Sequence, residues 1–191
     1  LFDSSANISS AGTGVVALLL NGQYTGGFVS TYSVEGENKG TISLGNDSAA
    51  IYGKNGARLS NTGTINVGES SVGLYALGSG ADVKNTGTIS IGKNSTGLYL
   101  RGGQDIVNNN IIAATGAGSI GMYTDSNTGI VENNNTIELS GDKVIGIYSV
   151  NGTQNIVNNG TIKIGNSGNT DDPGIGIYTK SLTDTVVNNG T

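Results

Sequence analysis

The sequence predicts an all-β fold: a right-handed, three-sided parallel β-helix (β-solenoid) of about seven coils of about 24 residues each. Two observations lead to this prediction. The pattern Asn-x-Gly-Thr-Ile, or a close variant, returns along the chain, and a Gly-[Leu/Ile/Met]-Tyr tripeptide follows most copies after about half a period. The first pattern starts at Asn38, Asn61, Asn85, Asn108, Asn133, Asn158 and Asn188, and the second places Tyr52, Tyr75, Tyr99, Tyr123, Tyr148 and Tyr178. Self-similarity at such a fixed period is typical of a solenoid.

Composition agrees with strands and turns. The 191 residues include 33 Gly and a single Pro, and Asn, Thr, Ser, Ile and Val are abundant. Asn and Gly favour turns, and β-branched residues favour strands. Gly in a helix interior costs about 1 kcal/mol relative to Ala, so long helices are disfavoured. Because a repeat array buries one continuous core between neighbouring coils, residues 1–191 are expected to form a single domain.

The copy at 81–103 shows how one coil is built. Polar and apolar residues alternate over short stretches around Val83, at 88–91 and at 96–100, which predicts three strands. The breaks between these stretches contain Gly or Asn, residues that tolerate positive φ. Three strands and three corners per coil predict a three-sided solenoid.

Stacked parallel coils lie about 4.8 Å apart and place equivalent residues in columns. Four aliphatic columns are expected to point inward and form the core. They are Leu59, Val83, Ile106, Val131, Ile156 and Val186; Ile42, Ile65, Ile89, Ile112, Ile137 and Ile162; Leu44, Val67, Ile91, Ala114, Leu139 and Ile164; and Ile51, Leu74, Leu98, Met122, Ile147 and Ile177.

The repeated asparagine is expected to form a structural ladder. Side-chain amides that stack in successive coils can hydrogen-bond to one another along the solenoid axis. The alternative is a set of N-linked glycan acceptors, since Asn7-Ile8-Ser9 and Asn94-Ser95-Thr96 fit the acceptor pattern. In a chain so rich in Asn, Ser and Thr such tripeptides occur by chance, so the ladder is the preferred interpretation.

The tyrosine column is predicted to lie on the outer surface, beside a glycine column made of Gly73, Gly97, Gly121, Gly146 and Gly176. An exposed aromatic stripe can stack on sugar rings or anchor a protein partner, which makes Tyr75, Tyr99 and Tyr123 candidate binding residues. The alternative is that the tyrosines only stabilise neighbouring strands by stacking on one another. Their regular recurrence favours this alternative.

Two segments interrupt the repeat and are candidate contact sites, because function tends to be added where a repeat array is irregular. An insertion at about 17–33 contains Tyr24 and Phe28, and a loop at about 166–173 contains Asp171 and Asp172. The two adjacent carboxylates raise the hypothesis of a calcium site. Adjacent carboxylates in a solvated loop rarely bind a metal specifically, so no metal is expected.

Several functions are disfavoured by residues that the chain lacks. It contains no Cys and no His, which excludes thiol nucleophiles, zinc–thiolate sites and a Ser-His-Asp triad built from this chain. Nine scattered Lys and Arg and a net charge of −5 argue against nucleic acid as a partner. The longest apolar run, 15–20, is too short to span a bilayer as a helix. Neither enzymatic activity nor a cofactor is expected.

The units 61–68 and 71–75, repeated through most of the chain, resemble the passenger domains of bacterial autotransporter proteins, especially the large fusobacterial outer-membrane adhesins. The resemblance covers residues 34–191 well and residues 1–33 poorly. It implies a right-handed β-helix that is secreted through a C-terminal β-barrel and stays on the surface of a Gram-negative cell. No binding residues can be transferred from it. Both ends of the chain fall inside a repeat, so we expect an excerpt of a longer passenger.

The resemblance and the repeat together predict a role in adhesion to host or bacterial cells through a surface protein or glycan, without membrane contact by this segment. A second possibility is a structural stalk that holds a distal binding region away from the cell. A third, which we disfavour, is a β-helix polysaccharide lyase or hydrolase, because the acidic residues do not concentrate in any column.

Overall fold

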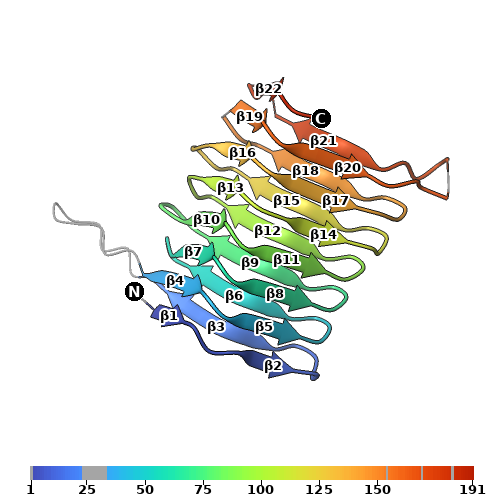
Figure 1. Cartoon of the computed structure of the whole chain (residues 1–191). Helices are drawn as coiled ribbons and strands as arrows, with labels where there is room; N and C mark the ends of the chain where they lie inside the picture. Colours follow the sequence, from blue (N-terminus) through green and yellow to red (C-terminus); the bar gives the residue numbers. More distant parts are fainter. Residues whose placement is uncertain (1, 23–33, 154, 169, 182) are drawn as a thin grey trace, which may run out of the picture.

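The computed structural model describes residues 2–22, 34–153, 155–168, 170–181 and 183–191. Over these ranges the chain forms 22 strands and no helix, as an all-β fold requires. Every strand pairs in parallel with the equivalent strand of the neighbouring coil, which gives three sheets. Figure 1 shows the coils stacked from β1 and β2 at one end to β21 and β22 at the other. The chain is therefore a three-sided β-solenoid.

We name each sheet after its most regular residue. The asparagine sheet consists of β1 (Phe2–Ser4), β4 (Glu35–Asn38), β7 (Arg58–Asn61), β10 (Asp82–Asn85), β13 (Ile106–Asn108), β16 (Val131–Asn133), β19 (Asn155–Asn158) and β22 (Thr185–Asn188). The isoleucine sheet consists of β2 (Ile8–Ser10), β5 (Thr41–Leu44), β8 (Thr64–Val67), β11 (Thr88–Ile91), β14 (Ile112–Ala114), β17 (Thr136–Leu139) and β20 (Thr161–Ile164). The tyrosine sheet consists of β3 (Val16–Asn21), β6 (Ala49–Lys54), β9 (Val72–Leu77), β12 (Thr96–Arg101), β15 (Ile120–Asp125), β18 (Ile145–Val150) and β21 (Ile175–Lys180).

The register confirms the predicted core columns. Ile89 pairs with Ile65 on one side and Ile112 on the other, and all three side chains are fully buried. The other three columns line up in the same way and join one continuous apolar core. The burial weakens at the last coil, where Val186 is 44% exposed because no described strand lies beyond β22.

The asparagine column forms the predicted ladder inside the solenoid. Each side-chain amide nitrogen donates to the side-chain oxygen of the asparagine in the next coil. The N···O distances are 2.8 Å for Asn38–Asn61, 2.9 Å for Asn61–Asn85, 2.9 Å for Asn85–Asn108, 2.8 Å for Asn108–Asn133, 2.7 Å for Asn133–Asn158 and 2.7 Å for Asn158–Asn188. Because every bond points the same way, the buried Oδ1 of Asn38, at the first rung, has no donor among the described residues.

The number of regular coils is lower than predicted. About five turns of about 24 residues follow one another without interruption. Successive rungs of the asparagine ladder are 23, 24, 23, 25 and 25 residues apart between Asn38 and Asn158, and the last rung is 30 residues further on. The prediction of seven coils also counted the first turn, which contains the insertion, and the last, which contains the loop at 166–173.

The predicted insertion at 17–33 starts too early. Residues 17–21 belong to β3, whose Leu18 and Leu19 pair with Ile51 and Tyr52 of the next coil. Leu19 therefore occupies the position that tyrosine takes in the later coils. Residues 23–33, including Tyr24 and Phe28, lie outside the described residues.

The glycine column does not face outward as predicted. In β12 the neighbours Thr96 and Leu98 both pair with adjacent strands, but Gly97 between them does not. A Cβ added to Gly97 would lie 2.7 Å from Cγ2 of the buried Ile112, so this position faces the core. Two successive residues, Gly97 and Leu98, therefore point inward, and the alternation of side chains is interrupted at the same place in the neighbouring strands. Strict alternation does not hold through this interruption, and this explains the wrong assignment.

Truncation of an inward side chain should destabilise the fold much more than truncation of an outward one. Ile89→Ala is expected to lower the free energy of unfolding by about 2 to 5 kcal/mol, because it opens a cavity in a continuous core. Ser90→Ala, on the outer face of the same strand, is expected to change it by less than about 0.5 kcal/mol. Urea unfolding followed by circular dichroism measures both. Equal losses for the two variants would contradict the inward direction of Ile89.

Candidate functional site

Six tyrosines form a continuous ladder on the outer face of the tyrosine sheet. They are Tyr52, Tyr75, Tyr99, Tyr123, Tyr148 and Tyr178. Neighbouring ring centroids lie 4.4 to 5.3 Å apart. The first five side chains are half-buried and Tyr178 is 36% exposed, which confirms the predicted partial exposure.

The rings mostly cover one another. Tyr52 and Tyr75 stack with an interplanar angle of 15°, and Tyr99 and Tyr123 stack at 13°. Tyr75 meets Tyr99 edge to face, at 81°. Since sugar stacking needs a free aromatic face, this arrangement favours stabilisation of neighbouring strands over recognition of a sugar by the rings.

The tyrosine hydroxyls in the middle of the ladder are held in the neutral form. Burial, and then the neighbouring Tyr75 and Tyr123, raise the pKa of Tyr99 to about 12, and Arg101 only partly opposes this. Burial, and then Asp125 and Tyr148, also raise the pKa of Tyr123. At neutral pH the ladder therefore presents uncharged phenols.

The raised pKa of Tyr99 predicts a loss of stability in alkali. The unfolded chain releases the Tyr99 proton near its ordinary pKa of about 10, whereas the folded chain holds it up to about 12. Stability from this group is therefore complete below about pH 10 and is lost as pH rises through about 12. We expect unfolding in urea to show a shallower alkaline decline in Tyr99→Phe than in the parent chain. Identical slopes would contradict this.

A polar depression lies on the outer face of the asparagine sheet. It spans three successive coils, β4, β7 and β10, and has a volume of about 400 Å³. Its lining includes Glu37, Arg58, Ser60, Thr62, Asp82 and Lys84. Ser60 lies at the centre, because it pairs with Glu37 on one side and Lys84 on the other. The small serine between long side chains leaves the hollow.

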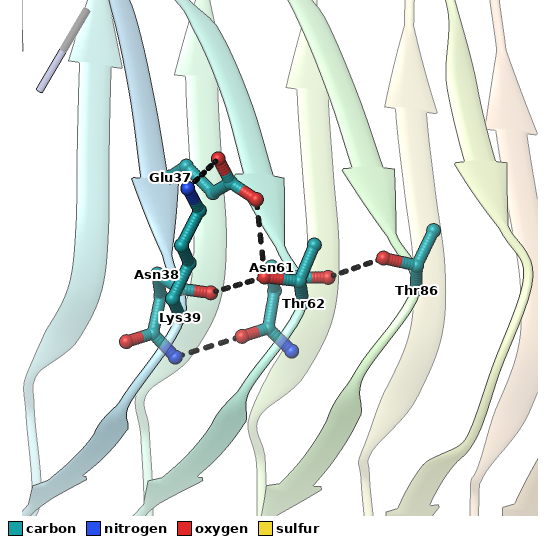
Figure 2. Close-up of polar contacts among 6 residues, drawn as sticks. All are labelled: Glu37, Asn38, Lys39, Asn61, Thr62 and Thr86. Atoms are coloured by element: carbon teal, nitrogen blue, oxygen red, sulfur yellow. Dashed lines mark hydrogen bonds and ion pairs between the residues drawn. The ribbon is translucent and has the colours of Figure 1, made fainter. Parts of the chain in front are cut away.

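Neighbouring groups hold the polar side chains of this depression in place. Oγ1 of Thr62 lies 3.0 Å from Oε1 of Glu37 and 3.2 Å from the carbonyl oxygen of Asn38. The Lys39 ammonium lies 3.5 Å from the other oxygen of Glu37. Figure 2 shows these contacts beside the buried bond between Asn38 and Asn61, with Thr86 repeating the contact of Thr62 one coil further on. The threonine hydroxyls outside therefore bond to the backbone of the same asparagines whose side chains form the ladder inside.

Arginine and aspartate close the other side of the depression. Nε of Arg58 lies 3.0 Å from Oδ2 of Asp82, and the register places Glu35 next to Arg58 on the opposite strand. The Lys84 ammonium has no hydrogen-bond or ion-pair partner in the described part of the chain. With three carboxylates (Glu35, Glu37 and Asp82) and two cations (Arg58 and Lys84), the site combines donors and acceptors and carries a net charge of 2 − 3 = −1.

Sequence reasoning missed this depression because it followed only the columns in which the same kind of residue recurs. The outward column that runs through Ser60 contains Glu37, Ser60, Lys84, Val107, Glu132, Val157 and Val187. Its first three members are polar and differ from one another, whereas valine occupies three of the later positions. A change in the outward residues within an otherwise regular array was the available signal.

Among the described residues, the structure brings the three predicted tyrosines together but not the two predicted aspartates with them. Tyr75, Tyr99 and Tyr123 lie on the tyrosine sheet, whereas Asp171 and Asp172 lie in the loop between β20 and β21. Asp172 forms an ion pair of 3.1 Å with Lys143, and Asp171 is exposed. No cluster of three or more acidic side chains arranged to hold a metal ion occurs among the described residues. Calcium binding by this loop stays a hypothesis.

Both predicted glycan-acceptor asparagines, Asn7 and Asn94, are exposed, and the side chain of Asn7 accepts a hydrogen bond from the Thr41 amide at 3.0 Å. Their modification stays a hypothesis.

None of the residues that the structure describes forms a helix long and apolar enough to cross a membrane. Comparison of the chain with protein-family models, with curated proteins and with solved structures found no significant match.

Proposed function

We propose that this chain is a segment of a cell-surface adhesin, a secreted rod that mediates or supports attachment to a host cell or another bacterium. The observation behind the proposal is the uniform stacking of one strand per sheet in each coil. A coil in such an array contacts only its neighbours, and each added coil lengthens the rod by about 4.8 Å. This geometry suits a protein that spans a distance.

The resemblance of the repeat units to autotransporter passengers supports the same proposal. It would place the chain outside a Gram-negative cell, anchored by an outer-membrane barrel that is not part of this segment. The partner would be a protein or glycan of the opposing cell surface. We also take the coil to be right-handed, as nearly all parallel β crossovers are.

Matched deletions of whole coils can distinguish a segment that binds the partner from one that serves only as a stalk. Deleting residues 38–84 removes two repeats and most of the polar depression, and it joins Glu37 directly to Asn85, which continues the ladder. Deleting residues 108–157 also removes two repeats but leaves every lining residue of the depression in place, and it joins Val107 directly to Asn158, which continues the ladder. If this segment makes the contact, only the first deletion should abolish attachment of cells that display the surface protein. If it is a stalk, both deletions should weaken attachment to the same degree.

Surface display has to be confirmed for each variant with an antibody to a part of the protein outside the deletions. Normal display combined with unchanged attachment after removal of residues 38–157 would contradict the adhesin proposal as a whole. This larger deletion joins Glu37 to Asn158 and therefore also preserves the register of the ladder.

A polysaccharide hydrolase or lyase is the second candidate function, because the depression contains three carboxylates. Glu35 and Glu37 are two residues apart on one strand, a separation of about 7 Å, and inverting glycosidases place their carboxylates about 6.5 to 9.5 Å apart. However, Glu37 is occupied by Lys39 and Thr62. Incubation with a polysaccharide panel should therefore produce no new reducing ends or unsaturated products. Products that disappear in Glu37→Gln would establish the enzyme instead.

A further inference from the structure

We infer that the depression around Ser60 on the asparagine sheet is a binding site for a neutral, hydroxyl-rich sugar unit of a surface glycan. The inference deepens the proposed adhesin function by naming a ligand class and a place for it. It is carried by the shape of the depression, by its mixture of donors and acceptors, and by its departure from the repeat.

The shape provides a floor and walls. Ser60 forms the floor, and Glu37 and Lys84 rise on the two adjacent strands, each about 4.8 Å away. Arg58, two positions before Ser60 on the same strand, and Thr62, just beyond the end of that strand, flank Ser60 in the lining. The volume of about 400 Å³ lies within the range of small-molecule sites, roughly 300 to 1,000 Å³.

The chemistry of the lining fits a polyol. Each sugar hydroxyl both donates and accepts a hydrogen bond, so it matches a wall where carboxylates alternate with cations and hydroxyls. The carboxylate oxygens of Glu37 and Asp82 each have one protein partner and a second lone pair that can accept from the ligand, while the Lys84 ammonium donates to it. The net charge of −1 disfavours a sulfated or otherwise polyanionic glycan. No aromatic residue lines the depression, which disfavours a flat apolar ligand.

The polar groups are already oriented before a ligand arrives. The Thr62 hydroxyl is positioned by Glu37 and by a backbone carbonyl, and the Arg58 guanidinium is positioned by Asp82. Pre-orientation lowers the entropy lost on binding. Because the depression is open and shallow, we nevertheless expect a dissociation constant on the order of 1 mM, which an array of copies on a cell surface would strengthen by multivalency.

Stacking of the coils does not require this set of residues. The positions equivalent to Ser60 in two of the next coils are Val107 and Val157, and these coils keep the same ladder and core. The charged residues around Ser60 are therefore additions to the repeat rather than parts of it. Irregular outward positions in a repeat array are where binding functions are placed.

The test uses the isotope-labelled 191-residue chain and nuclear magnetic resonance. Lactose, chitotriose and maltotriose serve as neutral probes, and a heparin oligosaccharide serves as the polyanion. We expect at least one neutral probe to shift the backbone amides of Glu37, Ser60, Thr62 and Lys84. Ser60→Phe, which fills the hollow, should weaken this binding more than about tenfold.

Ser90→Phe is the matched control, because Ser90 is also a half-buried outward serine in the middle of a strand, on the isoleucine sheet. It should bind the probe as the parent chain does. If Ser60→Phe fails to fold, Glu37→Ala serves as the second variant, with a loss of at least about threefold expected. The inference is overturned by shifts that persist in these variants, by shifts located elsewhere, by binding of heparin alone, or by no shift with any neutral probe. Any of these results combined with loss of attachment after the coil deletions would leave the adhesin proposal standing.

Discussion

Replacing Asn85 by aspartate is expected to unfold the coil stack at neutral pH and to leave it folded in acid. Asn85 is fully buried, and its Nδ2 lies 2.9 Å from Oδ1 of Asn108 and 3.4 Å from the carbonyl oxygen of Ile111. A carboxylate oxygen at this place would face two acceptors, with no cation among its partners. An uncompensated buried charge costs about 3 to 5 kcal/mol or more, a large part of the stability of a domain.

The dependence on pH has a definite sign. Burial disfavours the charged form of the introduced carboxyl group, so in the folded state it holds its proton to a higher pH than in the unfolded chain. The destabilisation should be small below about pH 4, where the group is protonated in both states, and should grow as pH rises above that value. A protonated carboxyl group also restores a donor toward Asn108.

Urea midpoints of Asn85→Asp and the parent chain, measured across this pH range, would test the expectation. Asn134→Asp is the control, because Asn134 belongs to a second row of amides outside the solenoid, where its Nδ2 donates to Asn109 Oδ1 at 2.9 Å. Asn134 is exposed, so this change should cost less than about 1 kcal/mol at any pH. A neutral-pH midpoint for Asn85→Asp equal to that of the parent would show that the buried ladder is not needed for stability.

Sequence alone was sufficient for the features that every coil repeats. Ile65, Ile89 and Ile112 recur at equal spacing, and parallel stacking admits one register in which all of them are buried together. The asparagine ladder followed from the same reasoning, because an amide that recurs beside a core column lies within hydrogen-bonding reach of its equivalents above and below. The outward direction of the tyrosines was also predictable from their position next to the Leu98 column.

The remaining features depend on geometry that strict alternation does not contain. The interrupted alternation at Gly97 turns one more residue per coil toward the core, and only the backbone of the folded strand reveals it. The polar depression requires Glu37, Ser60 and Lys84 to meet across three coils, although they are far apart in the chain. The three residues share one outward column but differ in type, so a pattern based on recurring residues does not single them out as one site.

The inward direction of Gly97 leads to the second large effect: Gly97→Val is expected to lower the free energy of unfolding by more than about 4 kcal/mol. Valine is one of the best strand formers, so local propensity favours the change. A Cβ at this position, however, would lie 2.7 Å from the carbonyl oxygen of Gly121 and 2.7 Å from Cγ2 of Ile112. Neither neighbour can retreat easily, because one is backbone in the next coil and the other is core.

Gly176→Val is the matched control, since Gly176 occupies the same column in the last coil and a Cβ there would meet no atom within 4 Å. It should unfold within about 1 kcal/mol of the parent in urea. The double variant Gly97→Val with Ile112→Ala divides the cost of Gly97→Val between its two causes. Relief of the side-chain contact should restore only part of the loss, because the contact with the Gly121 carbonyl remains. The close approach of successive coils would then be the reason why this position requires glycine. If Gly97→Val were as stable as Gly176→Val, this explanation would be refuted.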